Sequence, residues 1–376
     1  MKTRGKIDLK KIDFVMIQVM ALLIAAGLYC VKMAQKVSEK KDSIFTKQIA
    51  GVVIGVVAIG VIVLLGYRLI CSLSPLIYIA VVVLLAATLV IGVDSRNVRR
   101  WINIAGISFQ PSELAKIALI LFLAYLCNHF RDKLDKLYVF LILAAVTVIP
   151  VSLILLEPHL SSSVVIVFIF CVIVFASGMS MKVIGTVVGI CVPLICMVLA
   201  SVILFNVDLP FISKYQVNRV TSFLAGDEED TNGAKDQQNK SVAAIQSGGS
   251  YGKIFAQDKG YASYEGLYSN ESDFIFAIAG EEFGFVGCCI LIALYFILVL
   301  RCLKHAIHAP DYIGRLICIG VSSQLMFQCF ANIGVATNIL PNTGLPLPFI
   351  SYGMTSLIGA MIGVGLVLSV STQERI

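Results

Sequence analysis

The sequence predicts an all-α polytopic membrane protein with about ten transmembrane helices and a large extracytoplasmic loop between spans 7 and 8. The first observation is composition: 58% of the 376 residues are hydrophobic and only 14% are charged, against about 25% charged in soluble domains. The second is a mean hydropathy of +0.91. The third is that apolar runs long enough to cross a bilayer recur along the chain. Lipid must therefore be the solvent for much of this surface.

Each long apolar run is expected to be a helix, because backbone polar groups in hydrocarbon must be satisfied within the segment. The basic N-terminus leads into the first run, and no small-residue cleavage site follows that run. We therefore interpret it as a retained first span and not as a signal peptide. We expect one membrane domain over residues 1–376, with a large outer loop at 206–272 and spans near 13–34, 48–66, 75–93, 112–129, 137–156, 161–178, 183–205, 273–300, 314–335 and 353–371.

The basic residues indicate an orientation. Ten spans place both termini on one side, and cytoplasmic connections of membrane proteins carry an excess of Lys and Arg. With the termini inside, the inner segments carry fourteen Lys and Arg, and the outer segments, without the long loop, carry nine. This difference favours cytoplasmic N- and C-termini. The net charge of +6 suits a protein that lies against anionic lipid, and no basic run is dense enough to indicate nucleic acid.

The eleven cysteines lie in or beside apolar runs, and none falls in the polar stretch 208–272. We interpret them as small hydrophobic residues at helix interfaces and not as a disulfide framework or a metal site. The sequence also has no phosphate-binding loop, dinucleotide fingerprint or zinc motif. His305 and His308 have a ligand-like spacing, but they lie in a basic cytoplasmic loop without partner acids or cysteines, so we regard them as weak candidates.

The first polar stretch, residues 94–116, sets Arg100 beside the only tryptophan, Trp101, and then opens a span. Glu113 and Lys116 are three residues apart, so they share a helix face and can pair at the mouth of a membrane cavity. A cluster of interfacial side chains that reach toward water explains this stretch about as well. Charges at the entrance of a span are nevertheless functional candidates.

The second polar stretch is the loop 208–272, 65 residues long. Loops of that length are usually either functional or disordered. Within it, residues 226–240 are expected to form a solvated turn. Asp273 follows at the lip of the next span, directly before Phe-Ile-Phe. Partial desolvation of this carboxylate should raise its pKa and make it useful in proton transfer. An N-terminal helix cap is the commoner role for an isolated aspartate in this position.

The third polar stretch, residues 338–356, holds three prolines and two glycines. It cannot form a regular span, so we expect a re-entrant or cavity-lining loop. Ser351, Tyr352, Thr355 and Ser356 offer hydroxyl groups to it. A rigid turn between spans would explain the prolines but explains the hydroxyls less well. All three stretches fall on the outer face in the predicted topology, which is the main indication of a functional site there.

Four motifs occur in order along the chain: RRW–FQPSELAK, QSGGSYGK, SDFIFAIAGEEFG and NTGLPLPFISYGMTS. Together with ten spans they resemble the shape, elongation, division and sporulation (SEDS) proteins, the FtsW/RodA/SpoVE group. The resemblance implies a peptidoglycan glycosyltransferase of the bacterial plasma membrane, which serves cell division or cell shape. Such an enzyme polymerises lipid II at the outer face and releases undecaprenyl diphosphate. The implied partner is a class B penicillin-binding protein, which crosslinks the new strands.

The resemblance also implies site residues. By position, Asp273 matches the essential acid of the family, and we expect it to be the general base that deprotonates the acceptor 4-hydroxyl, with inversion at the donor's anomeric carbon. Ser351 matches the last outer loop of the family. No organic cofactor is expected. The substrate diphosphate would be held, with or without a divalent cation such as Mg²⁺ or Mn²⁺, by a polar cluster of Arg100, Glu113, Lys116 and an arginine of the large loop, Arg219.

Two positions depart from the family pattern. Glu157-Pro158-His159 stands where relatives usually have Gln-Pro-Asp, and Met354 stands where they often have glycine. Two other functions remain open, a flippase for lipid II and a non-catalytic scaffold of the division or elongation machinery. The collection of polar features on one face argues against a transport path, and the presence of Asp273 argues against a scaffold.

Overall fold

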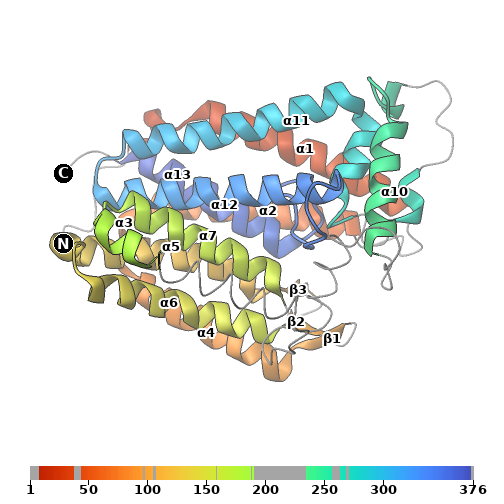
Figure 1. Ribbon diagram of the computed structural model, residues 1–376. Helices are drawn as coiled ribbons and strands as arrows, with labels where there is room; N and C mark the ends of the chain where they lie inside the picture. Colours follow the sequence, from red (N-terminus) through yellow and green to blue (C-terminus); the bar gives the residue numbers. More distant parts are fainter. Residues whose placement is uncertain are drawn as a thin grey trace.

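The computed structural model describes residues 8–37, 44–95, 98–104, 107–157, 159–187, 189, 234–255, 263–267 and 271–373. Long helices run along one axis of the molecule (Figure 1). Asp8 donates its backbone N–H to the carbonyl of Thr372, so the first and last described residues lie at the same end. The helices are α1 (Phe14–Val37), α2 (Ile44–Leu65), α3 (Tyr67–Ser72), α4 (Ser74–Ile91), α5 (Pro111–His129), α6 (Leu137–Leu156), α7 (Leu160–Ala176), α10 (Ala234–Ser247), α11 (Ile275–Ile307), α12 (Tyr312–Ala336) and α13 (Met354–Thr372).

The predicted all-α polytopic fold is confirmed. Within the described residues, eight helices are long and apolar enough to cross a membrane, and α7 is a shorter apolar helix. Their bounds agree with the predicted spans to within a few residues, except that α11 continues to Ile307, beyond the predicted end of its span. The seventh predicted span, 183–205, falls largely outside the described residues.

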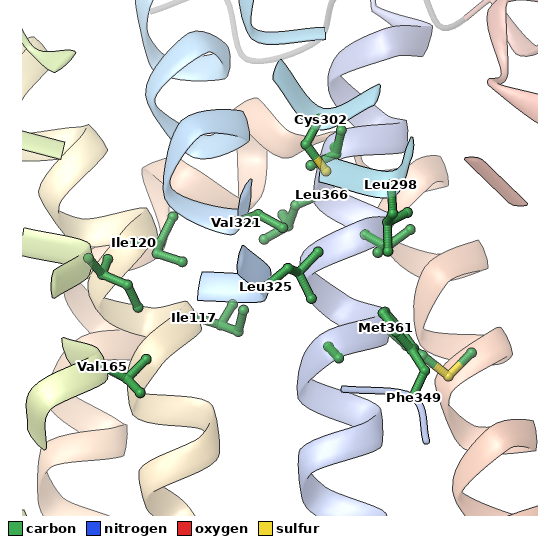
Figure 2. Close-up of a cluster of buried hydrophobic side chains, with 14 of the residues drawn as sticks. Ile117, Ile120, Val165, Leu298, Cys302, Val321, Leu325, Phe349, Met361 and Leu366 are labelled. Atoms are coloured by element: carbon green, nitrogen blue, oxygen red, sulfur yellow. The ribbon is translucent and has the colours of Figure 1, made fainter. Parts of the chain in front are cut away.

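The helices form an inner and an outer layer. In α5, α12 and α13, 72% of the apolar stretch is buried inside the protein, against 28% in α2, α4 and α6. The inner helices carry many of the buried polar side chains, because a polar group in a membrane needs partners within the protein. The apolar cluster shown in Figure 2 includes Ile117 and Ile120 of α5, Val321 and Leu325 of α12, Met361 and Leu366 of α13, and Leu298 and Cys302 of α11.

A small sheet precedes α5, in a stretch for which no strand was predicted. Strands β1 (Val93–Ser95), β2 (Val98–Ile104) and β3 (Ile107–Phe109) pair antiparallel in the order β1-β2-β3. The sheet lies at the same end of the bundle as α10 (Figure 1), and we call this end the sheet end. It carries Arg100 and Trp101 and leads directly into α5, which begins at Pro111.

Part of the large loop forms a helix that docks on the bundle. Helix α10 begins at Ala234, so the prediction of a solvated turn over 226–240 is wrong from that residue onward. Gln238 donates to the carbonyls of Val335 (3.1 Å) and Leu340 (2.8 Å), and Ser241 donates to Ala336 (2.8 Å). These side chains satisfy carbonyl groups at and just beyond the C-terminus of α12, which a helix leaves without intrahelical partners.

The glycines of the QSGGSYGK motif allow this loop to pack directly against the backbone of α11. A Cβ atom on Gly248 would come within 2.1 Å of the carbonyl oxygen of Gly280, and one on Gly252 within 2.2 Å of that of Glu282. Gly284, in α11, has a φ of +67° and packs against the same loop. Only glycine fits such close backbone contacts and such a φ. The motif is therefore structural at these positions.

The opposite end of the bundle holds two clusters of charged side chains. Asp13, ahead of α1, accepts hydrogen bonds from Arg301 Nε and His305 Nε2, each at 2.7 Å, and from the backbone N–H of Met16 at 3.1 Å. His305 therefore does have an acidic partner, which sequence spacing could not show. In the second cluster, Asp311 caps α12 and accepts from Arg68 Nε, the Tyr67 hydroxyl and the Gly314 N–H.

The cysteines within the described residues are all free thiols. Cys30, Cys71, Cys127, Cys302 and Cys318 are buried. These five confirm the interpretation of the cysteines as small hydrophobic residues between helices. Cys171 and Cys289 are exposed on the surface of apolar helices.

Candidate functional site at the sheet end

Asp273 lies directly before α11 and is half-buried. The N-cap of this helix is Phe274, and no side chain caps it, so the interpretation of Asp273 as a helix cap is wrong. Its Oδ1 accepts a hydrogen bond from Ser272 Oγ at 3.0 Å. A Cβ atom on Gly344 would lie 3.4 Å from its Oδ2. The carboxylate therefore faces the backbone of the proline-rich loop between α12 and α13.

Hydrogen bonds to the backbone hold this loop in place. Asn332 Nδ2 donates both to the carbonyl of Asp273 (3.0 Å) and to that of Leu345 (2.7 Å). Ser351 Oγ donates to the carbonyl of Ser272 (2.7 Å) and accepts from the N–H of Leu347 (2.8 Å). The structure thus places the Ser351 hydroxyl between backbone groups, where it orders the loop around Asp273.

Glu113 and Lys116 form the ion pair that their spacing predicts. Lys116 Nζ lies 2.7 Å from Glu113 Oε1, and 0% and 2% of the two side chains are exposed. Both residues lie near the N-terminus of α5, which is covered by α13 at Gly359. Each charge compensates the other, which a buried charge requires.

Arg100 contacts the turn between α6 and α7. Its Nε donates to the backbone carbonyl of Glu157 at 3.0 Å. In the same turn, His159 Nδ1 lies 3.4 Å from Gln110 Nε2. The N–H of Gln110 in turn donates to Thr355 Oγ1 at 3.2 Å. The sheet, the α6–α7 turn and the start of α13 therefore meet at one point.

One contact joins these residues to the neighbourhood of Asp273. Ser161, at the start of α7, donates its hydroxyl to the carbonyl of Thr343. Thr343 precedes Gly344, which lies against the Asp273 carboxylate. The structure thus connects the surroundings of Arg100 with those of Asp273. Arg219 lies outside the described residues.

Glu157 is a site residue that sequence reasoning recognised only as a departure from the family pattern. Its exposed fraction is 1%, and neither carboxyl oxygen has a hydrogen-bond partner. Burial raises its pKa to about 8, although Arg100 opposes the shift. The sequence feature that could have indicated Glu157 is an acid placed directly before a proline at the end of an apolar run. Three other buried hydroxyls of this region also have no partner: Ser112, Ser162 and Thr343.

The described residues offer no ready metal site. Among them, no three His, Cys, Asp or Glu side chains gather closely enough to hold a metal ion. Glu113 is already paired with Lys116, and Asp273 faces a glycine and a serine. The described residues therefore supply no preformed cage of protein ligands for a divalent cation.

Two buried acids near the sheet end have a structural role. Glu281 accepts from Lys253 Nζ and from the N–H of Tyr264. Glu282 accepts from the hydroxyls of Tyr29 (2.9 Å) and Tyr264 (3.2 Å). Burial and the neighbouring carboxylates raise the pKa of Tyr264. These bonds tie the large loop to α11 and α1.

Comparison with known proteins identifies the family. The family model FTSW_RODA_SPOVE, described as "cell cycle protein", matches residues 10–376. The chain is 30% identical to a probable peptidoglycan glycosyltransferase FtsW of Geobacter sp. (strain M18), over 96% of this chain and 97% of that protein. It is 32% identical to the peptidoglycan glycosyltransferase MrdB of Escherichia coli (strain K12), over 94% and 92%.

Solved structures agree with this result. The fold matches a chain from a structure of a peptidoglycan synthase complex that coordinates polymerization and crosslinking, with a TM-score of 0.78, 28% identity and coverage of 96% and 97%. It also matches the rod shape determining protein RodA of Thermus thermophilus, with a TM-score of 0.66, 25% identity and coverage of 96% of each chain. The chain belongs to the FtsW, RodA and SpoVE family of multi-pass membrane proteins, which confirms the resemblance seen in its motifs.

Proposed function

We propose that this chain is a peptidoglycan glycosyltransferase that polymerises lipid II at the outer face of the bacterial plasma membrane, for cell division or cell-shape maintenance. The observation that carries the proposal is the placement of Asp273, whose half-buried carboxylate faces the last loop and does not cap its helix. The names of the relatives FtsW and MrdB support the same activity. In this proposal the sheet end is the outer end and both termini are cytoplasmic.

In the proposed reaction, Asp273 is the general base. Its carboxylate takes the proton of the acceptor 4-hydroxyl while that oxygen attacks the anomeric carbon of the donor sugar. The bond between this carbon and the diphosphate oxygen breaks, the configuration inverts, and undecaprenyl diphosphate leaves with the electron pair. Ser272, which donates to Asp273 Oδ1, and the loop held by Asn332 and Ser351 keep the carboxylate oriented.

Cationic side chains would stabilise the charge that develops on the leaving diphosphate. Arg100 is fixed at the α6–α7 turn through its Nε. The hydrogen bond from Lys116 Nζ to Glu113 Oε1 fixes the orientation of the Lys116 side chain. Arg219 is the third cation of the proposal. A low-dielectric site at the membrane surface strengthens each of these attractions, and the polyprenyl tails stay in the lipid beside the helices.

We also propose a class B penicillin-binding protein as the partner of this chain, which would crosslink the strands that the chain makes. A structure of a peptidoglycan synthase complex among the similar folds supports such an assembly.

The test is incubation of the purified chain, with and without its partner, with labelled lipid II. Wild-type protein should give a ladder of glycan products, and Asp273→Asn should give none. Glu271→Gln is a matched control, because it removes a negative charge two residues away. Glycan synthesis by the Asp273→Asn variant would disprove the assignment of the base. Movement of lipid II across vesicles without any product would indicate a flippase.

A further inference from the structure

Helix α10 lies across the sheet end of the bundle, crosswise to the long helices (Figure 1). It contacts α11, and two of its side chains bond to the end of α12. These helices form the two sides of the Asp273 site. Helix α11 begins two residues after Asp273, and the loop that the carboxylate faces follows α12. The contacts of α10 therefore bear on the geometry of this site.

Two buried side chains of α10 hold the end of α12. Gln238 and Ser241 have exposed fractions of 3% and 0%. The Gln238 amide donates to the carbonyls of Val335 (3.1 Å) and Leu340 (2.8 Å), so one side chain joins the last turn of α12 to the loop that follows it. The Ser241 hydroxyl donates to the carbonyl of Ala336 at 2.8 Å. Helix α10 thus fixes the loop at the point where it leaves α12.

The loop after α10 is bonded to the backbone of α11. Helix α11 is interrupted at Gly284, whose φ of +67° and ψ of −171° lie in a region that essentially only glycine occupies. The N–H groups of the next two residues, Phe285 and Val286, bond to the carbonyls of Gly249 (2.9 Å) and Ser250 (3.1 Å). The loop thus supplies hydrogen-bond acceptors to α11 at its interruption.

The outer segment of α11, residues 275–283, packs directly on the end of α10. A Cβ atom on Gly280 would lie 2.8 Å from Ile245 Cγ1, and one on Gly248 would lie 2.1 Å from the carbonyl oxygen of Gly280. Such close packing leaves the segment no room to move toward α10. Asp273 directly precedes this segment and its N-cap residue. Helix α10 is therefore fixed to both sides of the site.

We propose that α10 is a brace for the Asp273 site and that Gln238 and Ser241 are positioning residues, which hold the α12–α13 loop at a fixed distance from the carboxylate. The inference rests on the proposed function, in which Asp273 is the general base. Asn332 joins the two sides from α12 itself, and α10 joins them from the large loop. A general base must lie within hydrogen-bond reach of the proton that it accepts, and a displacement of about 1 Å lowers a rate by about 100-fold.

The first experiment measures kcat and KM for glycan synthesis from labelled lipid II by the full-length chain. Gln238→Met keeps the length of the side chain but removes its donor, and Ser241→Ala removes the hydroxyl. Each variant should lower kcat by about three- to tenfold, and the double variant by about 10- to 100-fold, while KM changes by less than about twofold. KM is spared because neither side chain contacts the substrate in this proposal.

Two matched controls lie on the exposed side of the same helix. Gln246→Met and Ser247→Ala make the same chemical changes at exposed positions, and the Ser247 hydroxyl bonds only within its own helix, to the carbonyl of Ala244. Both variants should keep the wild-type kcat. The inference is overturned if the buried variants keep it too, if the controls lose as much activity, or if the loss lies in KM.

The second experiment separates positioning from folding. Hydrogen exchange and thermal unfolding are measured on the same variants, and the single variants carry the test if the double variant does not fold. The amides of Ile339 and Leu340, which bond to the carbonyl of Gly334, should exchange about tenfold faster, because the loop opens locally. The helices at the other end of the bundle should keep their protection. Loss of protection throughout the chain would make Gln238 and Ser241 structural residues and overturn the inference.

The same assay separates this inference from the proposed function. If wild type makes glycan, Asp273→Asn makes none and the Gln238→Met, Ser241→Ala double variant keeps the wild-type rate, only the inference fails. If Asp273→Asn still makes glycan, the assignment of the base fails, and the inference fails with it because there is no base to position. If wild type makes no glycan, both proposals fail.

Discussion

Two acids at the sheet end, Glu157 and Asp273, have surroundings opposite to those of Asp13 and Asp311 at the other end of the helical bundle. Glu281 and Glu282, also near the sheet end, are partnered. At the end where the termini lie, Asp13 and Asp311 each accept three hydrogen bonds, including one from an arginine. At the sheet end, the Glu157 carboxyl group accepts none, and Asp273 is presented to a loop and not to its own helix. Partnered acids stabilise a fold, whereas an unpartnered buried acid lowers its stability. The difference indicates that Asp13 and Asp311 hold helices together, and it agrees with the proposed role of Asp273 as a general base.

The pKa values express the same contrast. Burial alone would raise the pKa of Asp13, but hydrogen bonds from Arg301, His305 and the N–H of Met16 lower it to about 2. Burial raises the pKa of Glu157 to about 8, and the nearby charge of Arg100 does not reverse that shift. Both acids are almost fully buried. The number of donors that the surrounding helices supply decides which effect is larger.

The largest expected effect is the loss of activity when Asp273 changes. Asp273→Asn should reduce glycan synthesis by about 10²- to 10⁴-fold, the usual contribution of a general base, with an unchanged melting temperature in detergent. Rates come from a lipid II polymerisation assay and stability from thermal unfolding. A large loss of stability in this variant would place Asp273 with the structural acids of the other end and break the comparison.

The opposite result is expected for Asp13. Asp13→Ala removes the shared partner of Arg301 and His305, and we expect a loss of roughly 1–3 kcal/mol in the free energy of unfolding. The specific activity of the folded fraction should stay near wild type. Asp132→Asn, which removes an exposed acid at the same end, is the control and should leave stability unchanged.

The contribution of Asp13 also has a predicted pH dependence. Because its folded-state pKa is lowered from 3.8 to about 2, folding favours the ionised form. The stabilisation is fully present above the unfolded pKa and is lost as the pH falls through the folded value. The stability difference between wild type and Asp13→Ala should therefore shrink below about pH 4. A difference that stays constant down to about pH 2 would contradict the assignment of these hydrogen bonds.

Substitution of a glycine in the large loop is expected to lower stability by an intermediate amount. Gly248→Ala would place a methyl group 2.1 Å from a carbonyl oxygen of α11, so α10 and its loop must shift. We expect faster proteolysis of the loop and a destabilisation of about 1–3 kcal/mol, as for other overpacked sites. Gly60→Ala, in α2, meets no atom within 4 Å. It serves as the control and should leave the free energy of unfolding unchanged.

The last expected effect is confined to alkaline pH, where Glu157→Gln should gain stability. Because the folded-state pKa of Glu157 is raised from 4.5 to about 8, wild-type stability should fall as the pH rises from the first value to the second, and then stay level. The glutamine variant lacks this decline. Its melting temperature should exceed that of wild type at alkaline pH by a few degrees at most and equal it near pH 4. A variant less stable than wild type at alkaline pH would make Glu157 a structural residue.

The sequence by itself determined the membrane fold, most of the helix bounds and the pairing of Glu113 with Lys116. These features are local: a hydrophobic run of fixed length specifies a span, and a spacing of three residues specifies a shared helix face. The motifs also placed Asp273, Arg100 and Ser351 on one face. The sheet before α5 was not predicted, because its short strands lie in a polar stretch without a clear alternating pattern.

Only the tertiary structure decided which polar groups find partners far away in the sequence. His305 meets Asp13 across 292 positions of sequence, and the Ser351 hydroxyl meets the carbonyl of Ser272 across 79. Burial raises the pKa of Glu157, because the helices around its turn bring Arg100 to its backbone and no donor to its side chain. Hydropathy and spacing report on neighbours in the chain, whereas burial and charge compensation depend on which turns meet at the end of the bundle.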